Sequence, residues 1–146
     1  MTTHLKKLAA GCKTIEALYE RQFSRIFDYD GDKAVPIWTR RKPTREGEIL
    51  EGGSLYWIMS GAIAARQTVL GLEKITDEED GTYCLIMVSA DIVRTVPEKH
   101  RPFQGWRYLE PAKAPADRGL FVPGDNDALD EIPEEMEADL RESGLL

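Results

Sequence analysis

Basic residues and aromatic residues occur close together at three places along this chain. Trp38 precedes the basic segment 40–45, and the same mixture recurs within 56–66 and 100–108. A guanidinium group is a permanent planar cation that donates paired hydrogen bonds to a phosphate or a carboxylate. An aromatic face stacks on an unpaired base for about 1–3 kcal/mol per base. On a β-sheet, this combination is typical of surfaces that hold single-stranded nucleic acid.

These residues predict one ligand-binding face, with RNA or a nucleotide-like molecule as the partner. The prediction requires Arg66 to lie on the same side of the molecule as segment 40–45, and it assigns Trp57 and Trp106 to the core. In the alternative interpretation, the aromatic residues are core and the arginines are scattered over the surface or paired with nearby acids. The candidate binding residues are Arg40, Arg41, Arg45, Tyr56, Arg66, Arg101, Arg107 and Tyr108, with Trp38 as a further stacking residue.

Signatures of catalysis and of metal binding are absent from the sequence. It contains no GxSxG, HExxH, P-loop or GxGxxG motif. His4 and His100 are its two histidines, and Cys12 and Cys84 stand far apart without the paired spacing of a zinc site. We therefore expect no metal, no cofactor and two reduced thiols.

Two other functions stay open. A hydrolase acting on a modified base needs a nucleophile, an activating base and an acid. Thr39 and Lys42 are close enough in sequence for the first two roles, and either Glu46 or Glu48 could supply the third. A protein–protein adaptor would instead use the acidic C-terminal segment as its contact.

The stretch 52–71 is the most apolar part of the middle of the chain, and leaving it in water would forgo about 25 cal/mol per Å². It must therefore be central to the fold. Alternate residues of 55–59 point to opposite faces in a strand, so both faces of this strand are covered. We predict one long strand that bends at Gly61, and a helix over 62–70 is the competing assignment.

A helix is predicted over 14–27, because apolar residues recur there at helical spacing and Thr14 is a suitable N-cap. Its polar side, which includes Arg21 and Arg25, is interpreted as a solvated face. Pro36 cannot donate to a sheet, so its strand is expected at an edge or at a strand start. The other strands are expected over 3–9, 34–40, 72–75, 82–88, 92–96 and 102–109, with 76–81 as the turn of a hairpin.

This pattern predicts an α+β fold. We expect a curved, mostly antiparallel sheet of five or six strands, or a partly closed β-barrel (PUA-like), packed by the N-terminal helix. The folded domain is expected to span 1–110, and 111–146 is expected to be a Pro-rich extended connection followed by an acidic tail.

The sequence predicts a cytoplasmic protein. No apolar run of about 20 residues is present to span a membrane, so no membrane partner is expected. The N-terminal residues lack the apolar core and cleavage site of a secretory signal.

The acidic residues are concentrated at the C-terminus. The whole chain has a net charge of −7, whereas 125–146 alone carries −8 and 1–124 carries about +1. The acidic segment either keeps the protein soluble, folds over the protein's own basic face as a mimic of nucleic acid, or contacts a basic partner.

Two strings of residues resemble a known family. The strings GGSLYW at 52–57 and RPFQGWRYL at 101–109 are similar to those of a proteobacterial family described only as a domain of unknown function. The resemblance extends from Leu5 to about Pro111 and implies no activity or catalytic residues. A fainter similarity, at the level of the fold, is to the PUA and ASCH group of small β-barrels, several of which bind RNA or modified nucleotides.

Truncation after Gly124 tests whether the acidic segment mimics nucleic acid. If it covers the basic face, the truncated protein is expected to bind a labelled oligonucleotide more tightly than the full chain at low salt, because a competing polyanion has been removed. Fluorescence anisotropy measures the difference, and equal affinities would exclude the mimic.

Overall fold

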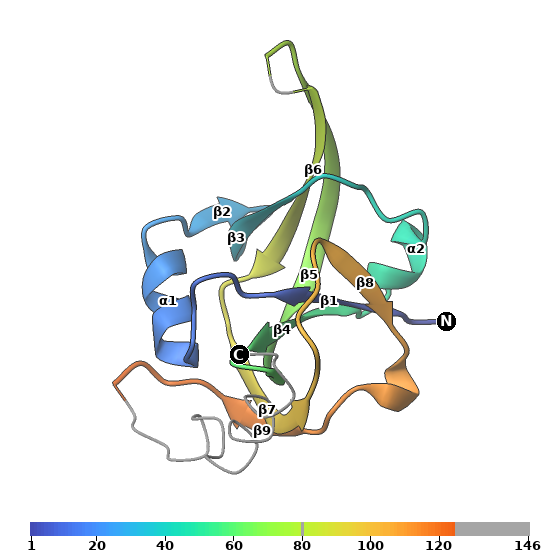
Figure 1. Ribbon diagram of the computed structural model, residues 1–146. Coiled ribbons are helices and arrows are strands. Elements are labelled where there is room, and N and C mark those ends of the chain that lie inside the picture. Colours follow the sequence, from blue (N-terminus) through green and yellow to red (C-terminus); the bar gives the residue numbers. More distant parts are fainter. Residues whose placement is uncertain (80, 125–146) are drawn as a thin grey trace.

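The computed structural model describes residues 1–79 and 81–124, which form a strongly twisted sheet with two short α-helices (Figure 1). The elements in chain order are β1 (His4–Leu8), α1 (Ile15–Phe23), β2 (Phe27–Tyr29), β3 (Asp32–Thr39), α2 (Glu46–Ile49), β4 (Ser54–Met59), β5 (Ala62–Asp77), β6 (Gly81–Ser89), β7 (Val93–Lys99), β8 (Trp106–Leu109), the 3-10 helix η1 (Pro111–Lys113) and β9 (Asp117–Leu120).

The strands form one mixed sheet in the order β2-β3-β6-β5-β4-β1-β8, with β7 paired to β5 and β9 paired to β7. All pairs are antiparallel except β1 with β4. The end strands β2 and β8 do not pair with each other, so the sheet is open. Of the two architectures expected from the sequence, the curved open sheet is present and the partly closed barrel is not, within the described residues.

Strand β5 organises the sheet because it is 16 residues long and changes partners along its length. Its first half lies between β4 and β7, and its second half pairs with β6. The end of β5 and the start of β6 project from the body as a two-stranded arm (Figure 1). The strand predicted over 62–70 is confirmed, and the competing helix is not formed.

The predicted single ribbon through 54–71 is wrong, because the chain reverses direction at residues 60 and 61. Ser60 and Gly61 have φ angles of 48° and 79°. Positive φ at both central residues defines a type I′ turn, the two-residue turn whose twist matches an antiparallel hairpin. Gly61 therefore completes a turn between β4 and β5 and is not a bend in a continuous strand.

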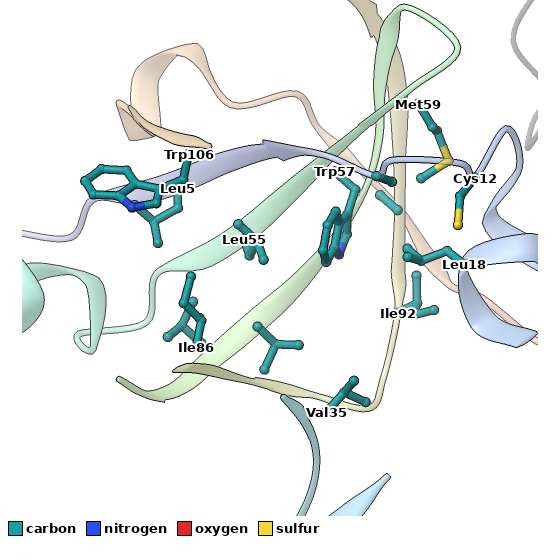
Figure 2. Packing of buried hydrophobic residues seen from close by; sticks show 14 of the residues in the cluster. Leu5, Cys12, Leu18, Val35, Leu55, Trp57, Met59, Ile86, Ile92 and Trp106 are labelled. Carbon is teal, nitrogen blue, oxygen red and sulfur yellow. The ribbon is translucent and has the colours of Figure 1, made fainter. Parts of the chain in front are cut away.

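The core lies on both faces of β4, as the alternation of residues 55–59 predicted. Leu55, Trp57 and Met59 belong to the larger apolar cluster, whereas Tyr56 and Ile58 belong to a smaller cluster on the other face. Figure 2 shows Trp57 beside Leu55 within the larger cluster.

Both tryptophans assigned to the core from the sequence are buried. Trp57 and Trp106 are each 4% exposed. Trp106 packs near Leu5 of β1 (Figure 2) and so covers the larger cluster from the β8 side.

Helix α1 begins where the sequence predicted but ends earlier. The Thr14 hydroxyl accepts a hydrogen bond of 3.1 Å from the Ala17 amide, which satisfies one free donor of the first turn. The helix ends at Phe23, and the chain enters β2 at Phe27, so residues 24–27 are not helical.

A buried amide pair attaches α1 to the sheet. The Gln22 and Gln67 side chains donate to each other over 2.9 and 2.7 Å, and the Trp57 indole donates to the Gln67 oxygen over 2.7 Å. Gln67 also donates to the Ser89 carbonyl over 2.9 Å. Buried amides that lose such partners are costly, so this network specifies where α1 packs.

The expected extended connection after residue 110 contains ordered elements. Strand β9 pairs with β7, and Phe121 is only 7% exposed and belongs to the larger apolar cluster. The folded part of the described chain therefore continues to at least Phe121. The acidic segment 125–146 lies outside the described residues.

Gly53 is a position where the fold requires the absence of a side chain. A Cβ atom there would collide with the backbone oxygens of Thr3 and Ile49. Gly53→Ala is therefore expected to lower the free energy of unfolding by about 1–3 kcal/mol, the usual range for overpacking. Gly47→Ala is the matched control, since nothing lies within 4 Å of a Cβ at Gly47. Urea denaturation measures both, and equal stability of the two variants would contradict the packing.

Candidate functional site

A groove runs along an unpaired edge of β3. Strand β2 pairs only with residues 32–34, so residues 35–39 are paired on the β6 side alone. Pro36 lies in this edge, as its missing N–H predicted. Across the groove lie Lys7 of β1 and one side of α1.

Trp38 is common to three adjoining cavities. An outer cavity of about 410 Å³ lies between Trp38 and Tyr83, and a middle cavity of about 480 Å³ reaches Trp106. An inner cavity of about 190 Å³ extends under α1 to Trp57. Because Trp38 lines all three, we treat them as one feature and call it the Trp38 groove.

The Trp38 ring is exposed although it is large and apolar. Its side chain is 53% exposed, and its ring lies 4.7 Å from the Tyr83 ring at an interplanar angle of 50°. Tyr83 comes from β6 on the projecting arm, so two rings from neighbouring strands line the outer part of the groove. An exposed aromatic pair of this kind is a ready stacking surface.

The charges that line the Trp38 groove all have one sign. Among residues 1–79 and 81–124, no carboxylate lines the three cavities. Lys7 is partly buried, and this burial lowers the pKa of its ammonium group. The cationic lining residues are Lys7, Arg21, Arg25, Arg40 and Arg41.

Arg41 joins the end of β3 to β8. Its guanidinium carbon lies 4.3 Å from the centre of the Trp106 ring. The Trp106 indole in turn donates to the Arg41 carbonyl over 2.6 Å. These contacts close one end of the groove without any strand pairing.

Arg45 and Tyr108 lie beyond this contact and hold each other. The Arg45 guanidinium donates to both oxygens of Glu48 over 2.8 and 2.9 Å and lies 5.0 Å from the Tyr108 ring centre. The hydrogen bond from Arg45 lowers the pKa of the Glu48 carboxyl. Tyr108 also accepts a hydrogen bond from the Arg45 amide over 3.2 Å. Both predicted site residues therefore have structural partners next to the groove.

The predicted single arginine face is wrong. Arg107 faces Lys6 across β8 and β1, Lys6 lies beside Tyr56 of β4, and Tyr56 faces Arg66 of β5. Side chains of residues that lie directly opposite each other on paired strands point to the same face of the sheet. Side chains of consecutive residues in one strand point to opposite faces. Since Lys7 lines the Trp38 groove, Lys6 and this whole row lie on the other face of the sheet, which we call the Lys6 face.

Two predicted residues on the Lys6 face are engaged in the structure. Tyr56 is only 4% exposed and has no open ring face for a base to stack on. Arg66 donates to both oxygens of Asp117 over 2.8 and 2.7 Å and to the Ser54 hydroxyl over 3.0 Å. The hydrogen bonds to Arg66 lower the pKa of the Asp117 carboxyl. Arg66 therefore ties β9 to the centre of the sheet.

The remaining two predicted arginines lie near the loop that precedes β8. Arg101 is exposed in this loop, and Arg107 stacks on Phe103 with its guanidinium carbon 4.4 Å from the ring centre. The eight predicted residues are therefore divided between the Trp38 groove, the adjoining β8 contacts, the Lys6 face and, for Arg101, the loop before β8.

The structure brings two of the residues proposed for hydrolysis, Lys42 and Glu46, into direct contact. Thr39 lines the Trp38 groove, but the Lys42 ammonium is paired with Glu46 at 3.1 Å and Glu48 is held by Arg45. No observation in the described structure favours this activity. In residues 1–79 and 81–124, no three His, Cys, Asp or Glu side chains gather where a metal ion could be held.

Sequence reasoning missed Lys7, Tyr83 and the two arginines of α1 as lining residues. Arg21 and Arg25 are four residues apart and so share one side of the helix, but the same spacing is equally typical of a solvated face. Only the docking of α1 against the sheet places that side at the groove.

The fold and the groove define a class: a small protein built on an open, mixed sheet, with a basic groove around an exposed tryptophan. A family profile described as "Protein of unknown function (DUF1489)" matches residues 5–146, and the chain belongs to this family. No curated protein and no solved structure gives a significant match. Among the described residues, the helices are too short or too polar to cross a bilayer.

Asp117→Asn tests the ion pair with Arg66. The pKa of Asp117 is lower in the folded than in the unfolded protein. The ion pair therefore stabilises the fold fully at pH values above the pKa that this carboxyl has in the unfolded protein. This contribution is lost as the pH falls through the lower, folded-state pKa. Because the Asp117 side chain is 46% exposed, we expect a loss of no more than about 1 kcal/mol at neutral pH.

The comparison of wild type and Asp117→Asn at several pH values checks this expectation. The two proteins should converge in stability in acid, where the wild-type carboxyl is protonated. Asp32→Asn is the control, since Asp32 forms no ion pair with any described residue. A constant difference at all pH values would contradict the role of the charge.

Proposed function

We propose that the protein is a binding module for single-stranded RNA, which it holds in the Trp38 groove. The observation that carries the proposal is an exposed tryptophan in a groove whose lining, among the described residues, has five cations and no carboxylate. Arg66, Arg101 and Arg107 do not line this groove and take no part in the proposal. The proposal rests on the Trp38 groove alone.

The two kinds of side chain in the groove suit the two parts of a nucleotide. Trp38 presents a ring on which a base can stack, and Tyr83 provides a second ring beside it. Lys7 and Arg41 also line the middle cavity, where they can pair with the phosphates that follow the base.

An unpaired strand fits this groove better than a duplex. Stacking on Trp38 requires access to the face of a base, and base faces are covered by neighbouring bases in a double helix. The groove is also bounded by β1 and α1 on one side and β3 on the other, so the tryptophan is not presented on an open, flat surface.

The proposal includes a comparison of this fold with the PUA and ASCH group. The sheet is curved and mostly antiparallel, a feature in common with the PUA and ASCH group, but it is open where the members of that group are barrels. A cytoplasmic location would give the protein access to RNA. Fold-level similarity does not establish function, so the site chemistry carries the proposal.

Trp38→Ala is expected to weaken binding of a labelled mixed-sequence oligoribonucleotide by about 5- to 150-fold, the equivalent of about 1–3 kcal/mol of lost stacking. Arg41→Gln is expected to weaken binding and to reduce the slope of log affinity against log salt by about 0.7, the value for one phosphate contact on a single strand. Fluorescence anisotropy over a series of salt concentrations measures both effects.

Two matched variants serve as controls. Phe23→Ala removes another exposed ring, and Lys74→Met removes an exposed cation on the arm, and neither residue lines the Trp38 groove. Both should bind like the wild type. Salt-independent binding, or equal losses in the control variants, would overturn the proposal. A partner from cell extract whose capture resists nuclease would favour the adaptor alternative.

A further inference from the structure

Two cations lie directly opposite each other on the Lys6 face. Lys6 of β1 and Arg107 of β8 are registered partners in an antiparallel pair. Side chains at such positions are neighbours, and like charges placed there destabilise the sheet. The Trp38 groove does not include either residue, because both point to the opposite face from Lys7 and Trp106.

A third cation, Lys113, lies near this face, because the next residue, Ala114, packs with Phe103 against the smaller apolar cluster. Burial lowers the pKa of the Lys6 ammonium, and the nearby charges of Arg107 and Lys113 lower that pKa further. Glu98 opposes this effect but forms no ion pair with Lys6. Within residues 1–79 and 81–124, no carboxylate lies within 4 Å of the cationic groups of Lys6, Arg107 or Lys113.

His100 holds the Lys6 ammonium in place. The His100 Nδ1 atom lies 2.7 Å from the Arg101 carbonyl oxygen, which can only accept, so Nδ1 carries the proton. The Nε2 atom of that tautomer is then an acceptor for the Lys6 ammonium, which lies 2.9 Å away. One proton of Lys6 is thereby engaged by an uncharged partner, and its positive charge is not neutralised.

Arg107 is held in a similar way by an uncharged partner. Its guanidinium carbon lies 4.4 Å from the centre of the Phe103 ring. Stacking on a ring face orients a guanidinium group and leaves its edge free to donate paired hydrogen bonds. Two adjacent cations are therefore oriented by neutral groups, an arrangement that suits a phosphate group between them.

We infer that Lys6, Arg107 and Lys113 form a phosphate-binding site on the Lys6 face, with His100 and Phe103 as positioning residues. The ligand is a phosphate group. Two of its oxygens would accept the paired hydrogen bonds of Arg107, and its negative charge would attract the ammonium groups of Lys6 and Lys113. This site is separate from the Trp38 groove and does not depend on the function proposed for it. The phosphate belongs either to a small molecule or to a nucleic-acid strand.

The test titrates the full-length protein with inorganic phosphate at constant ionic strength and pH. Isothermal titration calorimetry is expected to detect binding to the wild type, and Lys6→Met and Arg107→Gln should each weaken it at least tenfold. Lys74→Met and Trp38→Ala, which alter neither the site nor its neighbours, should bind phosphate like the wild type. Phosphate should also raise the melting temperature of the wild type but not of Lys6→Met, by linkage.

Folding of the variants is checked by the same melting curves in phosphate-free buffer. Lys6→Met is expected to melt no lower than the wild type, because it removes a like-charge repulsion. If either sheet variant unfolds, Lys113→Met replaces it, since Lys113 is exposed outside the strands and should also weaken phosphate binding. Absence of phosphate binding to the wild type, or unchanged binding by folded site variants, overturns the inference.

A second titration distinguishes the two sources of phosphate. The probe is an oligoribonucleotide without a terminal phosphate. If Lys6→Met and Arg107→Gln weaken phosphate binding alone, the site serves a small phosphorylated molecule. If they also weaken oligoribonucleotide binding, the site contacts the backbone of a strand. Loss of oligoribonucleotide binding in Trp38→Ala, with phosphate binding retained, would separate this site from the proposed RNA groove.

Discussion

The register between β4 and β5 is the constraint on which the rest of the structure depends. The side-chain period of a strand is two, so a shift of one residue would exchange the two faces of the central sheet. The Ser60-Gly61 turn sets where the hairpin begins, and a register shift between Trp57 and Ile58 adjusts the pairing further along. With this register, Trp57 and Gln67 face α1, where the buried amide network joins them to Gln22.

The same register separates the basic residues into two surfaces. Strand β1 lies parallel to β4 and antiparallel to β8, so each of its side chains continues a row that crosses several strands. The row through Lys7 contains Trp106 and Trp57 and leads to the Trp38 groove. The row through Lys6 contains Arg107, and the two surfaces are insulated from each other by the sheet and its apolar clusters.

Several features of the fold could be predicted from local sequence because their causes are local. Thr14 caps α1 through its own hydroxyl, and Pro36 cannot occupy a fully paired position. The alternation of residues 55–59 predicted that both faces of this strand are covered. In the structure, alternate residues of this segment belong to the two different apolar clusters. The turn at Ser60-Gly61 differs from the predicted bend because positive φ is uncommon for serine, so the local sequence does not indicate a turn with positive φ at both central residues.

For the candidate site, the sequence by itself determined that arginine and aromatic residues are close in the chain and that the positive charge resides in residues 1–124. The tertiary structure decided which of them meet. Trp38 joins Lys7 and Arg21 because strands and a helix far apart in sequence converge at the unpaired edge of β3. Arg66 is separated from them because its pairing with Tyr56 places its side chain on the other face of the sheet. This pairing joins residues of different strands, so it cannot be predicted from a local sequence pattern.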